Sequence, residues 1–189
     1  MKDYLQKHYE YVEDLMDDKS FQARVLDTIN LISDCLLRNG TIYVFGNGGS
    51  AADALHISAE LVGKYLIDRK AFNVICLNSN TSILTALSND FDFSTIFSRQ
   101  LEAHHQHKNA VCWGISTSGN SKNVIEAFKY SKSSGIKTIG LTGQNGGELA
   151  EYSDILLNVQ CSKTPFIQQL HQIVYHYICE KVEERASFF

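Results

Sequence analysis

Two side chains that can hold a proton or a metal ion, His56 and Glu60, stand four residues apart in the segment DALHISAELV. Residues at this spacing lie on one face of a helix, so the imidazole and the carboxylate can converge on a single proton or metal ion. A solitary pair of this kind is more often a surface pair than a site. Its interest comes from position, because the predicted helix, from about 50 to 66, directly follows a glycine-rich loop.

A second group of polar side chains, Gln168, His171 and His176, interrupts the apolar segment IQQLHQIVYHYI in the predicted last helix, from about 165 to 184. His171 and His176 are five residues apart, which is about 500° of helical rotation, so they face different directions. We expect one of the two to be a packing histidine. The histidines of the HHQH segment, residues 104–107, are expected at the solvated surface.

Two predicted strand-to-helix loops carry glycines and hydroxyls: FGNGGSAADALH, residues 45–56, and GISTSGNSKNVIEA, residues 114–127. Glycines expose backbone amides at a helix start and hydroxyls add further donors, so such loops can bind a phosphate without lysine. Either loop alone is compatible with a plain helix cap, but the two together favour a phosphate site. The residues concerned are Gly46, Gly48, Gly49, Ser116, Thr117, Ser118, Gly119 and Ser121.

Neither loop matches the best-known nucleotide-binding motifs. The segment GNGGS does not satisfy G-x-G-x-x-G, and the chain has no G-K-[ST] sequence, so a Rossmann dinucleotide site and a P-loop are disfavoured. A third glycine-rich turn, LTGQNGGELAEYSD, is interpreted as a structural connection between a strand and a helix.

Short apolar runs, separated by helical stretches long enough for crossovers, must position these groups. Runs of this kind are typical of strands buried on both faces, so we predict a parallel α/β sheet whose carboxyl edge carries both loops. Residues 2–38 have helical spacing and predict two helices broken near Asp18; a further helix is predicted at 121–134. The five predicted strands are 41–45, 72–77, 110–115, 137–141 and 154–159.

Composition narrows the class of protein. The chain has 189 residues, 44% of them hydrophobic, which is enough for one core. A net charge of −4 gives no basic surplus for nucleic acid, and no run of about 18 apolar residues could span a membrane. Five cysteines without a C-x-x-C spacing fit a reducing cytoplasm. We expect one cytoplasmic domain over 1–189, with a helical arm (1–39) and an α/β core (40–189).

With these residues in view, the chain resembles the sugar isomerase (SIS) domain family and, within it, the phosphoheptose isomerases. The likeness runs through both loops, through the last helix and through SNDFDFSTIFSRQ, residues 88–100, which is the most family-specific segment. It implies a flavodoxin-like α/β sandwich that assembles as a homotetramer with sites at subunit interfaces. It also implies conversion of sedoheptulose 7-phosphate to D-glycero-D-manno-heptose 7-phosphate, the first step toward ADP- or GDP-heptose for lipopolysaccharide or capsule.

Carried over residue by residue, the resemblance implies that Glu60 and His176 form the acid-base pair. It also implies one zinc ion per subunit, with His56, Glu60, Gln168 and His176 as ligands. Gln168 and His176 are ~12 Å apart along a helix, so either both side chains lean toward one ion or different subunits contribute them. The implied substrate contacts are Asn47, Gly48, Gly49, Ser50, Glu60, Asn89, Asp90, Ser116, Thr117, Ser118, Ser121 and Gln168.

The chain departs from the family pattern at three positions. Many relatives have an arginine and a glutamate where this chain has Phe166 and Gln169, and an arginine where it has Lys64. These changes bear on sugar recognition, because lysine lacks the planar fork of arginine.

Two alternative functions stay open. One is a non-catalytic SIS protein that binds a replication initiator, and the presence of Glu60 and His176 disfavours it. The other is an isomerase of a different phosphosugar, which the SNDFDFSTIFSRQ segment and the chain length, with no appended domain, disfavour.

Overall fold

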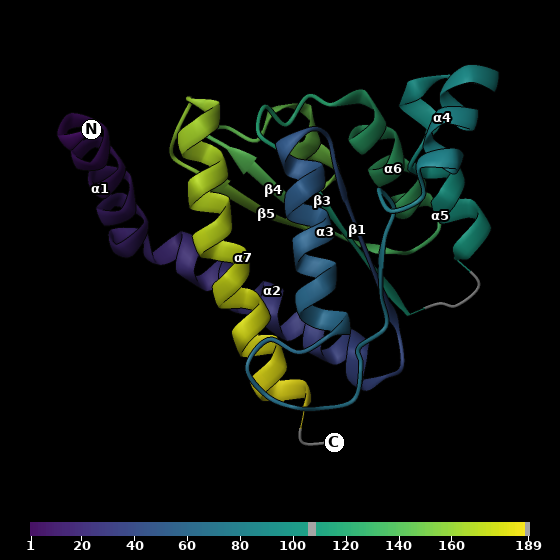
Figure 1. Ribbon diagram of the computed structural model, residues 1–189, viewed down its shortest axis with the longest axis horizontal. Helices are drawn as coiled ribbons and strands as arrows, with labels where there is room; N and C mark the ends of the chain where they lie inside the picture. Colours follow the sequence, from purple (N-terminus) through teal and green to yellow (C-terminus); the bar gives the residue numbers. More distant parts are fainter. Residues whose placement is uncertain (106–108, 188–189) are drawn as a thin grey trace.

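The computed structural model describes residues 1–105 and 109–187, and it contains a five-stranded, fully parallel sheet in the order β2-β1-β3-β4-β5. All five strands predicted from the apolar runs are present, so the expected α/β class is confirmed (Figure 1). The elements are α1 (Lys2–Asp17), α2 (Lys19–Leu37), β1 (Thr41–Gly46), α3 (Gly49–Val62), β2 (Val74–Cys76), α4 (Thr81–Asp90), η1 (Phe93–Thr95), α5 (Ser98–His104), β3 (Ala110–Ser116), α6 (Lys122–Ser133), β4 (Lys137–Gly143), η2 (Gly147–Tyr152), β5 (Ile155–Val159) and α7 (Thr164–Ala186).

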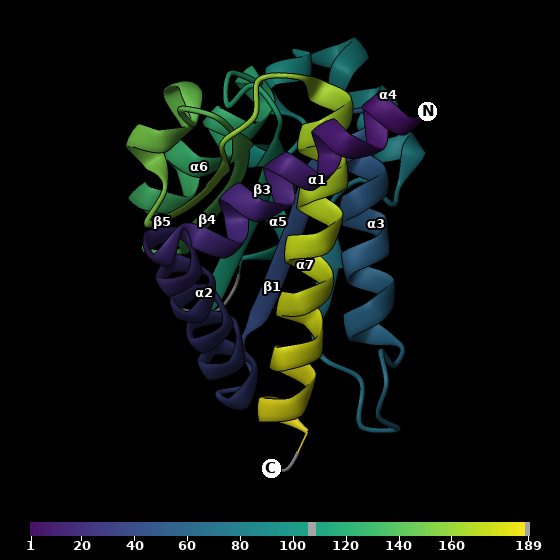
Figure 2. The same cartoon turned by 90° about the vertical axis from the view of Figure 1, so that its left-hand side faces the viewer.

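Helices cover both faces of the sheet, and each face has its own apolar core. Alternate side chains of a strand point to opposite faces, so Val44 joins the core beneath α2, α3 and α7, whereas Phe45 joins the core beneath α5 and α6. Figure 2 shows α2, α7 and α3 side by side on the first face. This arrangement explains why the strands are apolar throughout rather than alternating with polar residues.

The two predicted N-terminal helices are confirmed, and they differ in burial. Asp18 ends α1 and caps α2, because its carboxylate accepts a hydrogen bond from the backbone amide of Phe21 at 2.8 Å. α2 packs into the core through residues that include Phe21 and Ile32, whereas α1 has no buried residue. Only α1 therefore projects as an arm (Figure 1). The division into an arm (1–39) and a core (40–189) stays a prediction.

The position of β1 in the sheet decides where the two loops lie. β1 pairs with β2 on one side and with β3 on the other, so the chain leaves the carboxyl ends of β1 and β3 toward opposite sides of the sheet. Ligands of open α/β sheets bind at such a switch point. Gly46 pairs with Ile115 in the register, so the loops after β1 and β3 are neighbours; both lie at the carboxyl edge of the sheet, as the sequence predicted. No helix among the described residues is long and apolar enough to cross a membrane.

His171 is the packing histidine that the spacing predicted. It is fully buried in α7, and its Nε2 lies 3.0 Å from the backbone carbonyl of Thr142 in β4. Burial lowers the pKa of His171 from 6.5 to about 4. Of the neighbouring histidine segment, His104 is exposed and His105 partly buried, while His107 lies outside the described residues.

The low pKa of His171 predicts a loss of stability in mild acid. Between pH 6.5 and about 4 the unfolded chain binds a proton at this position that the folded chain does not, so the free energy of unfolding falls as the pH is lowered. Replacing His171→Gln should flatten that dependence while lowering stability at pH 7. Urea unfolding at several pH values checks this, with the exposed His104→Gln as the control; equal slopes for His171→Gln and the wild type would contradict it.

Candidate functional site

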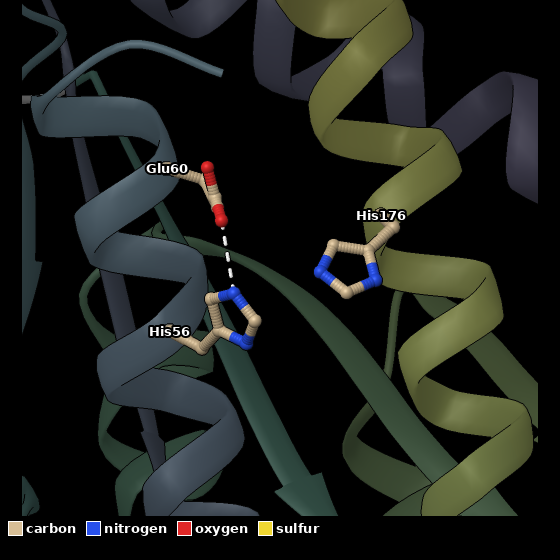
Figure 3. Close-up of side chains that lie close together, drawn as sticks. All are labelled: His56, Glu60 and His176. Carbon is tan, nitrogen blue, oxygen red and sulfur yellow. Dashed lines mark hydrogen bonds and ion pairs between the residues drawn. The ribbon is translucent and has the colours of Figure 1, made fainter.

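Three side chains that can ligate a metal or transfer protons meet between α3 and α7. His56 and Glu60 project from α3, and His176 faces them from α7 (Figure 3). The His56 Nε2 and the Glu60 Oε1 are 2.9 Å apart, and the rings of His56 and His176 pack edge to face at 4.9 Å. One donor atom from each of the three residues lies within 4.8 Å of the others. The structure thus brings together the two residues of the expected acid-base pair and three of the four expected metal ligands.

The surroundings of this trio keep His176 uncharged. Burial, followed by the neighbouring His56, lowers the pKa of His176 below its ordinary value of 6.5, and this outweighs the opposite effect of Glu60. At pH 7 His176 is therefore a neutral imidazole with a free lone pair. A neutral imidazole can accept a proton or bind a metal ion.

A buried carboxylate holds the loop that follows α3 beside the trio. Glu183 of α7 accepts hydrogen bonds from the backbone amides of residues 65–67 at 2.6 to 2.9 Å and pairs with Arg69 at 3.1 Å. Burial alone raises the pKa of Glu183, but the amides and the Arg69 charge more than offset this, so the pKa lies below its usual value. The clamp places the ring of Tyr65 6.0 Å from that of His176.

The loops after β1 and β3 are joined by a pair of amide side chains. The Asn47 Nδ2 donates to the Asn123 Oδ1, and the Asn123 Nδ2 donates to the Asn47 Oδ1, both at 2.8 Å. Asn78 adds a second brace, because its side chain donates to the carbonyl and accepts from the amide of Gly46. The first turns of α3 and α6 are thus fixed relative to each other at the sheet edge.

The hydroxyls that were expected to bind a phosphate lie at the start of α6. The Ser116 Oγ and the Ser121 Oγ are 2.9 Å apart, and Ser121 is the N-cap residue of α6 without a capping bond from its side chain. Thr117 and Ser118 follow in the same turn, and Ser118 Oγ accepts from the amide of Asn120. The arrangement offers hydroxyls beside the positive end of a helix, which suits an anion.

The glycine loop brings the start of α7 against the start of α3. Gly48 has a φ of 56°, a backbone conformation that favours glycine. A Cβ on Gly49 would collide with the side-chain amide of Gln168, and Ser50 beside it is buried. Gln168 therefore lies beside the loop rather than beside His176, and its role as a metal ligand stays a prediction.

Asn89 and Asp90, the remaining expected contacts, form the exposed end of α4. The Asn89 Nδ2 donates to the Asp90 Oδ1 at 2.7 Å, and no described hydrogen bond connects either side chain to the two loops. α4 has no buried residue, and it lies at the same edge of the molecule as the first turns of α3 and α7 (Figure 1). Their contact with a substrate stays a prediction.

The departures from the family pattern have a structural consequence. Phe166 stacks on Tyr4 of α1, with ring centroids 4.6 Å apart, and Gln169 donates a hydrogen bond to the Tyr4 hydroxyl at 3.1 Å. An aromatic contact thus joins α1 to α7 at these two positions. Lys64 is exposed in the loop after α3.

Sequence reasoning missed two residues that adjoin the trio, Asp53 and Tyr175. The Tyr175 hydroxyl lies 3.0 Å from the Nδ1 of His56, and Asp53 is buried beside both. A signal for Asp53 was present, because it precedes His56 by three residues and shares its helix face. Tyr175 had no such signal, because an aromatic residue in an apolar helix normally indicates a core position.

Comparisons with known proteins identify the family of this chain. Residues 3–143 match the model of the SIS domain family. A phosphoheptose isomerase of Synechocystis sp. is 44% identical over 168 residues, 89% of this chain and 86% of that protein. The structure of a phosphoheptose isomerase from Neisseria gonorrhoeae superimposes with a TM-score of 0.89 at 34% identity, covering 97% of this chain and 96% of the other. One from Francisella tularensis gives 0.91 at 26% identity, with the same coverage.

The two superimposed structures each cover 97% of the chain. The chain therefore belongs to the SIS domain family and, within it, to the phosphoheptose isomerases.

Proposed function

We propose that this protein isomerises sedoheptulose 7-phosphate to D-glycero-D-manno-heptose 7-phosphate in the cytoplasm, as a step toward heptose for lipopolysaccharide or capsule. Membership of the phosphoheptose isomerases supports the substrate class. The single observation that carries the proposal is the approach of Glu60 and His176 from two helices, near the edge where the two candidate phosphate loops follow adjacent strands. Five buried, free cysteines are in keeping with a reducing compartment.

The proposed chemistry moves a proton between C1 and C2 of the sugar through an enediol. The Glu60 carboxylate removes the proton from carbon, and the neutral imidazole of His176 exchanges protons with the adjacent oxygens. The lowered pKa of His176 suits its role, because a neutral imidazole can accept a proton, and Glu60 lies beside it, only partly exposed.

The phosphate supplies the binding energy that orients the reacting carbons. Gly49 begins α3 and His56 lies ~10 Å further along it, so a sugar held by its phosphate at the loops extends along α3 toward the trio. The loops offer hydroxyls and helix-start amides as donors. Fixing the remote phosphate places C1 and C2 against Glu60 without requiring strong contacts at the carbons themselves.

The trio also fits a zinc ion. Two imidazoles and one carboxylate, with donor atoms within 4.8 Å of one another, form the kind of three-ligand set that leaves a position open for substrate. When bound, zinc would act as a Lewis acid that polarises the sugar carbonyl. Gln168 would complete the set by turning away from Gly49 or by coming from another subunit.

Self-association is proposed through the face formed by α1, α2 and α7. A groove of about 640 Å³ lies there, lined by apolar side chains of all three helices. Met16, Leu26, Ile173 and Tyr177 are exposed along it, and α1 has no buried residue. A second copy of the chain offers the same apolar surface in return, and symmetric pairing would bury both, in keeping with the homotetramer that the resemblance implies.

The two catalytic assignments predict large losses of turnover. Glu60→Gln and His176→Gln should each lower kcat for sedoheptulose 7-phosphate by roughly 10²- to 10⁴-fold, because each removes a proton-transfer group while keeping a similar shape. The exposed Glu102→Gln and His104→Gln serve as matched controls. Near wild-type rates in folded variants would refute the roles, and a wild type without turnover would favour a non-catalytic SIS protein.

Zinc dependence forms a second prediction. Treatment with a chelator should abolish turnover, and zinc should restore it; His56→Gln should bind less than one zinc ion per chain by elemental analysis. The measurement pairs metal content with rate for each sample. Full turnover in protein shown to lack metal would contradict the zinc proposal and leave the acid-base roles intact.

The proposed interface predicts the oligomeric state. In sedimentation velocity the wild type should move as a species of about four times the 21.2 kDa chain mass. A charge in the groove, Ile173→Asp or Leu26→Asp, should produce smaller species and lower turnover, whereas Leu37→Asp, at the other end of α2, should not. A monomeric wild type with full turnover would overturn the proposal.

A further inference from the structure

The imidazole of His56 is held on both of its nitrogens. Its Nε2 faces Glu60 at 2.9 Å, and its Nδ1 faces the Tyr175 hydroxyl at 3.0 Å. Tyr175 is fully buried in α7, directly before His176, and its ring meets that of His56 edge on at 5.6 Å. The orientation of this ring is therefore set by α7 as well as by its own helix.

The buried carboxylate of Asp53 lies next to the Tyr175 hydroxyl. Asp53, one turn before His56 on α3, is only 5% exposed, and its Oδ2 has no hydrogen-bond partner within the described part of the chain. The Tyr175 hydroxyl and the Gln172 side chain are the polar groups next to it. A buried carboxylate oxygen without a partner is costly, so a reoriented hydroxyl that donates to it would be strongly favoured.

The proton of the Tyr175 hydroxyl has two neighbours that can accept it, Asp53 and the Nδ1 of His56. A tyrosine hydroxyl keeps its proton at neutral pH and can donate it to one of these acceptors. A carboxylate is the stronger acceptor of the two. Once the proton points to Asp53, the Tyr175 oxygen is free to accept a hydrogen bond from Nδ1–H.

Glu60 exerts the opposite preference, because a carboxylate beside Nε2 favours a proton on that nitrogen. The two sides of the ring thus compete for its proton, and they differ in burial: water can reach the Glu60 side chain, which is 22% exposed, whereas the buried Asp53 depends on the Tyr175 hydroxyl. Histidines that bind metals commonly donate their second N–H to an oxygen, which fixes the tautomer and strengthens the ligand.

We propose that Asp53 and Tyr175 are positioning residues that keep the proton of His56 on Nδ1 and so leave the Nε2 lone pair free for a metal ion held between His56, Glu60 and His176. Neither residue touches the substrate or the metal; both act through His56. This inference rests on the proposed zinc site, and it adds a relay of hydrogen bonds that runs from α3 to α7 and back.

The first test reads the tautomer in metal-free protein, with ¹⁵N-labelled histidine and long-range ¹⁵N–¹H NMR spectra at a mildly alkaline pH where ordinary histidines are neutral. His56→Gln assigns the signal. In the wild type we expect the proton on Nδ1, and in Tyr175→Phe and Asp53→Asn we expect it on Nε2, donated to Glu60. A wild-type proton on Nε2, or the same tautomer in all three proteins, would overturn the proposal.

The second test measures zinc affinity by competition with a chelator. Tyr175→Phe and Asp53→Asn should bind zinc roughly 10- to 100-fold more weakly than the wild type. The matched control is Tyr43→Phe, which also removes a buried hydroxyl, one that donates to the His104 carbonyl at 3.0 Å on the opposite face of the sheet. If Tyr175→Phe bound zinc as tightly as Tyr43→Phe does, the positioning role would be contradicted.

The two proposals can fail separately. Wild-type turnover and zinc content test the isomerase site, whereas the tautomer of His56 in metal-free protein tests the relay alone. Circular dichroism and thermal melting of each variant, compared with Tyr43→Phe, show whether a lost affinity reflects unfolding. If Tyr175→Phe proves unfolded, the Asp53→Asn variant decides whether the positioning role holds. This variant keeps the Tyr175 ring and replaces the carboxylate with an amide of the same shape.

Discussion

The packing of α3 beside α7 on one face of the sheet is the constraint on which the site depends. Apolar residues of both helices share one core, which sets their separation and the faces they turn to each other. Only with that packing do His56 and Glu60, one turn apart on α3, meet His176, which is more than a hundred residues later. The chemistry is thus assembled by burial of apolar surface, the dominant force in folding.

Features that depend on residues close together in the sequence could be predicted, whereas contacts between distant segments could not. The strands were predictable because full burial demands continuous apolar runs, and the His56–Glu60 pair because helical spacing is local. His176 was identified through resemblance, since no local rule places a residue of the last helix against the first crossover helix. Asp53 and Tyr175 were missed because their importance comes from contacts between helices.

Helix α1 is attached to the start of α7 by an aromatic contact and a hydrogen bond. Where many relatives are expected to carry charged residues, Phe166 stacks on Tyr4 and Gln169 bonds to its hydroxyl. An aromatic contact of this kind depends little on salt, in contrast to an exposed ion pair. Because α1 has no buried residue, this contact is a principal link between the arm and the rest of the chain.

A buried polar group that lowers stability lies directly beside His56, Glu60 and His176. Asp53 is a buried carboxylate with an oxygen that lacks a partner, and burial raises its pKa. Such a group costs free energy, on the order of 1–3 kcal/mol for one unsatisfied bond, and the apolar core around it would be more stable without it. Proteins commonly tolerate such costs at functional sites. The side chains of Gln172, Tyr175 and His56 adjoin Asp53, so its location is explained by the orientation of His56 better than by packing.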